Sequence, residues 1–287
     1  MSYICCLLVE LLLPKCIMSV SLPRKTKKWY AVAGRIGLSA KGVVYCLSGL
    51  LAVFAALHIQ GKTPKDAGQK GLFGSIHQLP LGNVLLITIA VGLICFTIWR
   101  LLQAIADTEQ KGTDKSGLVK RFTYLYSGLL YAAVAWYAFK EFSGERSNGS
   151  AKQDYISRLL SMPYGQWMVG IVAGCIIAVG IFQLYRAFSG KYKKYVRSAL
   201  HKDAAPWITT AGVAGYSARG VVWVVIGWLF IKSAVNANAG YVGGSDKAFA
   251  WLQDGWYGSL LLGLVALGLI CYGIFMFLRA RYQHFSN

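Results

Sequence analysis

Six stretches of the chain carry few or no charged residues, and each is long enough for one membrane-crossing helix. Such a helix needs roughly 20 apolar residues. Five stretches contain no Asp, Glu, Lys or Arg, and the other holds only the cations Arg219 and Lys232. The stretches lie between Lys41 and Lys62, Lys70 and Arg100, Arg121 and Lys140, Arg158 and Arg186, Pro206 and Ala234, and Asp254 and Arg279. This pattern predicts an all-α, polytopic membrane protein with six transmembrane helices.

Composition and charge agree with a membrane protein. Hydrophobic residues make up 56% of the chain and charged residues only 14%, whereas about a quarter of residues are charged in soluble domains. The net charge of +19 is typical of nucleic-acid binding proteins. Here, however, 18 cations fall on the side that holds both termini and nine on the other. The positive-inside rule therefore predicts cytoplasmic termini, and we expect no nucleic-acid partner.

The first 28 residues form a basic leader ahead of the first apolar stretch. Its apolar segment is short, contains Glu10 and lacks the cationic start of a secretion signal, so we do not count it as a span. An alternative hypothesis places the translation start at Met18. Detection of peptides from residues 1–17 in the native protein would reject that start.

The apolar stretches belong to three copies of one two-helix unit. Residues 37–45 (GLSAKGVVY) match residues 215–223 (GYSARGVVW) at an offset of 178, and the middle copy repeats Gly128 and Tyr131 but has Ser127 at the position of Lys41. The second helices also repeat, with Gln103, Arg186 and Arg279 at equivalent positions. We therefore divide the chain into the leader and three repeats, at residues 1–28, 29–110, 111–200 and 201–287.

The loops inside the units repeat as well. Apolar pairs at equivalent positions predict a short amphipathic helix on the outer membrane face before each second span. A glycine marks the start of each second span, at Gly82, Gly165 and Gly258. The apolar pairs are Phe73 with Ile76, Ile156 with Leu159, and Phe249 with Leu252.

Each two-span unit returns the chain to its starting side, so all copies share one orientation. We therefore expect pseudo-threefold symmetry about the membrane normal rather than inverted repeats. Gly170 and Gly174 form a GxxxG pattern in one span. We interpret it as a helix-packing motif, with a functional hinge as the alternative.

The paired segments at 37–45 and 215–223, together with 99–104 (WRLLQA) and Asp107, carry a family resemblance. They resemble the bacterial membrane-protein family catalogued as the domain of unknown function numbered 1206. The likeness covers residues 29–284, and it implies three two-helix repeats in a bacterial inner membrane without implying an activity. Lys41 stands where the family pattern has Arg, and Ser127 replaces the cation of the second copy.

The spans lack the residues of common membrane enzymes and pumps. All eleven Asp and Glu residues lie outside them, so no buried carboxylate is available to relay protons. No HExxH, GxSxG or CxxC pattern occurs, and His58 alone among the histidines reaches the end of a span. We therefore expect a non-enzymatic protein without a metal or cofactor, and an interfacial role for His58.

A group of cations near the inner face is the candidate site. It comprises Lys41, Arg219, Arg100, Arg186 and Arg279, joined by Gln103, with Arg35 and Asp107 close by. One reading is structural, with side chains that snorkel to the membrane surface or pair with helix-end carbonyls and Asp107. The other is a site for the head group of an anionic lipid or another small anion.

Two functions follow from these readings. The first is a non-enzymatic scaffold or lipid-contacting protein whose partners are membrane lipids. The alternative is a channel or facilitator for a small or anionic solute along the threefold axis. An axis filled by side chains favours the first function, and a continuous polar path favours the second.

Overall fold

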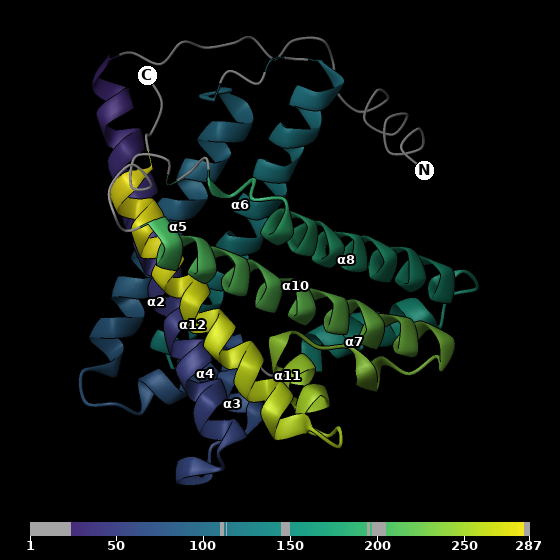
Figure 1. Cartoon of the computed structure of the whole chain (residues 1–287). Coiled ribbons are helices and arrows are strands. Elements are labelled where there is room, and N and C mark those ends of the chain that lie inside the picture. Colours follow the sequence, from purple (N-terminus) through teal and green to yellow (C-terminus); the bar gives the residue numbers. More distant parts are fainter. Residues whose placement is uncertain are drawn as a thin grey trace.

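The computed structural model describes residues 24–109, 112, 114–144, 150–193, 196 and 205–283, and every regular element in these ranges is a helix (Figure 1). The long helices are α2 (Arg24–Ala56), α5 (Gly82–Ile105), α6 (Lys115–Phe142), α8 (Gly165–Phe188), α10 (Ala205–Val235) and α12 (Gly258–Tyr282). The short ones are η1 (Ile59–Gly61), α3 (Pro64–Ala67), α4 (Gln69–His77), α7 (Ser150–Leu160), η3 (Ala239–Tyr241) and α11 (Ser245–Gln253). The predicted all-α class is confirmed.

Most of the predicted leader, including Met18, lies outside the described residues. Its last five residues, 24–28, are already helical and belong to α2. The first helix therefore begins earlier than the domain boundary predicted at residue 29.

Five helices are long and apolar enough to cross a membrane. They comprise Trp29–Ala56, Gly82–Ile105, Gly165–Phe188, Trp207–Val235 and Gly258–Tyr282, so the chain is a multi-pass integral membrane protein. The sixth predicted span corresponds to α6, which has 28 residues but is not one of these five. The hydroxyl groups of several of its residues, among them Tyr124, Ser127 and Tyr131, make α6 less hydrophobic than the five candidate spans.

The long helices form a ring with one open side. The most extensive contacts join the second helix of one repeat to the first helix of the next: α5 with α6, α8 with α10, and α12 with α2. Within repeats, α2 packs on α5 and α10 on α12, but α6 and α8 make no extensive contact. Figure 1 shows α8 and α10 side by side, running across the view at a wide angle to α6.

Each of the three contacts between repeats uses a glycine at the same repeat position. A Cβ atom added at Gly42, Gly128 or Gly220 would meet the side chain at one repeated position of the facing helix, Phe277, Leu101 or Leu184. Small residues at helix crossings allow close approach where lipid supplies no hydrophobic drive. The repeated sequence therefore produces a repeated interface.

The predicted short helices are present as α4, α7 and α11, and α5, α8 and α12 begin at the predicted glycines. At each of these glycines a Cβ would collide with a carbonyl oxygen near the end of the preceding short helix, that of Ile76, Leu159 or Gln253. The apolar faces of α4 and α11 are buried against the long helices. In these two helices the apolar pairs serve protein packing.

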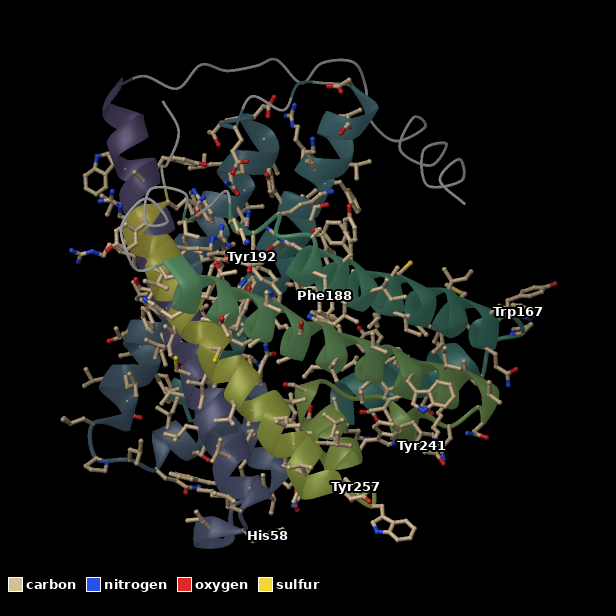
Figure 2. The ribbon with its side chains drawn as sticks, in the orientation of Figure 1. His58, Trp167, Phe188, Tyr192, Tyr241 and Tyr257 are labelled. Carbon is tan, nitrogen blue, oxygen red and sulfur yellow. The ribbon has the colours of Figure 1, made fainter. Side chains whose placement is uncertain are left out.

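The packing role predicted for Gly170 and Gly174 is wrong within this chain. A Cβ at either position would have no neighbouring atom within 4 Å. The two glycines lie on α8, which runs alongside α10 from Phe188 near the centre of the view to Trp167 at its edge (Figure 2), and their side of α8 carries no partner helix among the described residues.

Candidate functional site: a central cation cluster

Each of the five candidate spans contributes one cation to a central cluster. Lys41 lies on α2, and four arginines from the other four helices act on it electrostatically. These arginines are Arg100 of α5, Arg186 of α8, Arg219 of α10 and Arg279 of α12. We call the five residues the central cation cluster. The structure thus brings together all the cations of the predicted site, although their sequence positions span 238 residues (41 to 279).

Lys41 is enclosed by aromatic rings. Its side chain is 5% exposed, and its Nζ atom lies near the centroids of four rings from four helices. The distances are 4.5 Å to Tyr131, 5.0 Å to Phe96, 5.7 Å to Tyr272 and 6.0 Å to Tyr45. We call these four residues the aromatic cage. An ammonium group over such rings is attracted by their negative faces. The expectation that Lys41 snorkels to the surface is therefore wrong, because rings from three other helices and from its own helix enclose it.

Arg219 is bound to the same cage. Its Nη1 atom donates a hydrogen bond of 2.6 Å to the hydroxyl of Tyr272. Its Cζ atom lies 4.9 Å from the Tyr272 ring centroid and 5.3 Å from that of Tyr45. The buried Nε atom has no hydrogen-bond partner. Arg219 therefore keeps a donor available inside the cluster.

Arg100 begins a polar chain that leads out of the cluster. Its Nη1 donates to Gln103 Oε1 at 2.7 Å, and Gln103 Nε2 donates to Glu109 Oε1 at 2.7 Å. The Tyr124 hydroxyl donates to the other oxygen of Glu109 at 2.9 Å. Gln103 is buried and joins the cluster to this carboxylate. The polar chain lies toward the face where α2, α6 and α10 begin.

The other two cations sit at the ends of their helices. Arg279 is buried and donates from Nε and Nη2 to Gln283 Oε1, at 3.1 and 2.8 Å. The Cζ atom of Arg186 lies 5.0 Å from the ring centroid of Tyr216. These contacts hold both side chains at the edge of the cluster.

Arg121 makes the expected pairing of a cation with helix-end carbonyls. In the sequence, this residue marks only the boundary of the third apolar stretch. Arg121 donates to the carbonyl oxygens of Ala104 and Ile105, both at 2.8 Å, at the end of α5. A cation there satisfies orphan carbonyls and complements the helix dipole. Asp107 accepts a hydrogen bond from the backbone N–H of Gly112 at 2.8 Å. Arg35 is an exposed residue of α2.

The aromatic cage is the feature that sequence reasoning missed. Tyr45 and Tyr131 occupy equivalent repeat positions, and their hydroxyl oxygens are 3.4 Å apart. The ring of Tyr45 also lies edge-on to that of Tyr272, with centroids 4.8 Å apart. The repetition of an aromatic residue four positions after each cation position, at Tyr45, Tyr131 and Trp223, was the available signal. These rings fill the centre of the bundle beside the cations.

Other chemistries find little support in the described part of the chain. It contains no group of three or more His, Cys, Asp or Glu residues placed to hold a metal ion. His58 follows the end of α2, on the opposite side of the bundle (Figure 2), where its Nε2 lies 3.2 Å from Nε2 of Gln253. This contact ties the first loop to the third repeat.

Comparison with known proteins identifies relatives without an assigned activity. The chain is 33% identical to the uncharacterized protein YxxB of Bacillus subtilis (strain 168), over 92% of this chain and 95% of the relative. No solved structure matches the chain. One family model matches three times, at residues 36–107, 122–190 and 214–283, once within each repeat. The chain therefore belongs to the family described as Domain of Unknown Function (DUF1206), with three copies of that domain.

Proposed function

We propose that this protein is a non-enzymatic membrane protein that binds the anionic head group of a lipid at the central cation cluster. The observation that carries the proposal is the convergence of one cation from each of five candidate spans. Charged groups at membrane depth are costly, and they are retained where they serve function.

The cluster has an excess of positive charge. Four arginines lie within electrostatic reach of Lys41, and the printed contacts of Arg219 are with the neutral side chains of Tyr272 and Tyr45. Among the described residues, no carboxylate forms an ion pair with either side chain. A phosphate group would supply the missing charge, and Arg219 Nε is a donor suited to a phosphate oxygen.

The aromatic cage supports binding rather than conduction. Tyr45, Tyr131 and Tyr272 lie across the centre of the bundle, where Tyr45 contacts the hydroxyl of Tyr131 and the ring of Tyr272. A conducting path needs a wet, continuous lining. An axis crossed by these rings favours the lipid-contacting function over the channel.

We further propose that α6 is a sixth span and that the repeats are related by pseudo-threefold symmetry about the membrane normal. Helix α6 runs antiparallel to α5, from Arg121 beside Ala104 to Tyr137, whose ring lies 6.0 Å from that of Phe73. The glycine contacts repeated between successive repeats support the symmetry, from which the second repeat departs because α6 and α8 lie at a wide angle and do not pack on each other. The cation distribution supports a bacterial inner membrane location with both termini in the cytoplasm.

The function is tested with the double variant Lys41→Gln and Arg219→Gln. Native mass spectrometry of the purified protein would measure retained phosphatidylglycerol. Loss of two cations at about 1 kcal/mol each predicts a fall in affinity of at least about tenfold.

The matched control is Lys232→Gln with Arg281→Gln, which removes two cations from α10 and α12 outside the cluster. The control should retain lipid like the wild type. Equal retention by both double variants would refute the proposed site.

A further inference from the structure

We infer that the ring is open to the membrane between α6 and α8, and that the acyl chains of the anionic lipid occupy this opening while its head group reaches the central cation cluster. This inference rests on the proposed function and adds a route and a second contact surface. The open side is the place where the two helices of one repeat fail to pack.

Side-chain size explains why this side is open. In the first repeat, α2 and α5 meet through Gly37, Ala40 and Gly92, and a Cβ at Gly37 would lie 2.5 Å from the Cα of Phe96. The third repeat uses the same residue types at Gly215, Ala218 and Gly268.

The second repeat has larger residues at these positions. The equivalents of Gly37, Ala40 and Gly92 are Thr123, Tyr126 and Cys175. All three are exposed, whereas their counterparts in the other repeats are buried. A Tyr ring and a thiol stand where two backbones would have to touch, so α6 and α8 are held apart.

The opening lies at the depth of the cluster. Tyr126 is adjacent to Ser127, the repeat equivalent of Lys41. The two bordering helices also provide parts of the site, Tyr131 from α6 and Arg186 from α8. An occupant of the opening therefore faces the cations.

Charge and polarity identify the occupant as a lipid rather than a protein helix. The exposed side chains on both borders are mostly apolar, including Phe122 and Leu130 on α6 and Ile171 and Phe182 on α8. The inner end of the opening carries the excess positive charge. An anionic glycerophospholipid such as phosphatidylglycerol has both matching parts, acyl chains and a phosphate.

The test restores the small residues of the other repeats. The triple variant Thr123→Gly, Tyr126→Ala and Cys175→Gly should let α6 approach α8 and displace the acyl chains. Retained phosphatidylglycerol should fall about tenfold or more, while binding of inorganic phosphate, measured by calorimetry, should be unchanged. The control Ile94→Ala with Leu267→Ala trims exposed apolar side chains of α5 and α12 and should retain lipid.

A second measurement leaves helix packing unaltered. In a variant that keeps Cys175 alone among its cysteines, attachment of a bulky maleimide to this exposed thiol should fill the opening and reduce lipid retention to the same degree. The unlabelled protein is the control.

Each outcome separates the two proposals. Unchanged lipid retention in both the triple variant and the labelled protein would overturn the lateral opening and leave the head-group site intact. A wild type that binds inorganic phosphate but retains no diacyl lipid would also overturn the lateral opening, because the ligand would then come from water. If the wild type binds neither probe, the proposed function itself fails.

Discussion

Arg219 Nη1 lies 2.6 Å from the hydroxyl oxygen of Tyr272, and the guanidinium also faces the rings of Tyr272 and Tyr45. The contact joins α10 to α12 within the third repeat, and the Tyr45 ring extends it to the first. One cation thus fixes three helices around the centre of the bundle. A hydrogen bond from a charged donor in such a place contributes more than one between neutral groups.

Replacement of Tyr272 by Phe should destabilise the protein. The variant keeps the ring but leaves a guanidinium N–H without its acceptor, which costs about 1–3 kcal/mol. Thermal unfolding in detergent would show a lower midpoint. Tyr257→Phe is the control, since Tyr257 is 69% exposed and its hydroxyl is outside the cluster. A midpoint unchanged by Tyr272→Phe would contradict the stabilising role of this hydrogen bond.

The glycine crossings should be intolerant of side chains. At Gly49 a Cβ would lie 2.7 Å from Ile270 Cγ1 and 2.8 Å from the Ala266 carbonyl oxygen. Gly49→Leu should therefore force α2 away from α12 and cost about 2–3 kcal/mol. Gly174→Leu is the matched control because no atom lies within 4 Å of its Cβ position. Chemical denaturation in detergent compares the two, and equal stabilities would show that α2 and α12 do not cross at Gly49.

Much of the fold follows from repetition in the sequence, because each repeat must solve the same packing problem. The three helix starts at Gly82, Gly165 and Gly258 were predicted correctly, since a close approach to a carbonyl oxygen permits only glycine. The same reasoning failed for Gly174, where the pattern is present but no partner helix is. A glycine motif allows another helix to pack closely at that position, but the tertiary structure determines whether a helix lies there.

The sequence predicted which cations form the candidate site, but not how their side chains are arranged. Lys41 stood out as the cation that begins an apolar stretch, and Arg219 as a cation inside one. Their burial among aromatic rings depends on how α5, α6 and α12 surround α2, which one chain's periodicity does not specify. Phe96 and Tyr131 look like ordinary span residues until their rings are found 4.7 Å apart beside Lys41.

Arg121 should stabilise the end of α5. It is buried and donates to the carbonyl oxygens of Ala104 and Ile105. Arg121→Ala leaves two acceptors without this donor and should cost about 1.5–3 kcal/mol. Arg121→Lys should recover only part of the loss, because an ammonium group does not reproduce the two-point guanidinium geometry. Thermal unfolding of both variants provides the measurement, and full recovery by Lys would show that charge alone matters.

The crossing of α6 can be tested by labelling its two ends. Ser116 lies near the beginning of α6, and Ser143 follows its last residue. Single cysteines at these positions, in a background without other cysteines, should react with a membrane-impermeant maleimide from opposite sides. Ser116→Cys should be labelled only after the membrane is opened, since the cation bias places this end in the cytoplasm. Ser143→Cys should be labelled in intact cells. Labelling of Ser116→Cys that appears only after lysis is the control for sidedness.

Labelling of both cysteines from one side would show that α6 does not cross. The third repeat would then lie in the membrane with the opposite orientation to the first, which is incompatible with the equivalent glycine contacts made by Gly42 and Gly220.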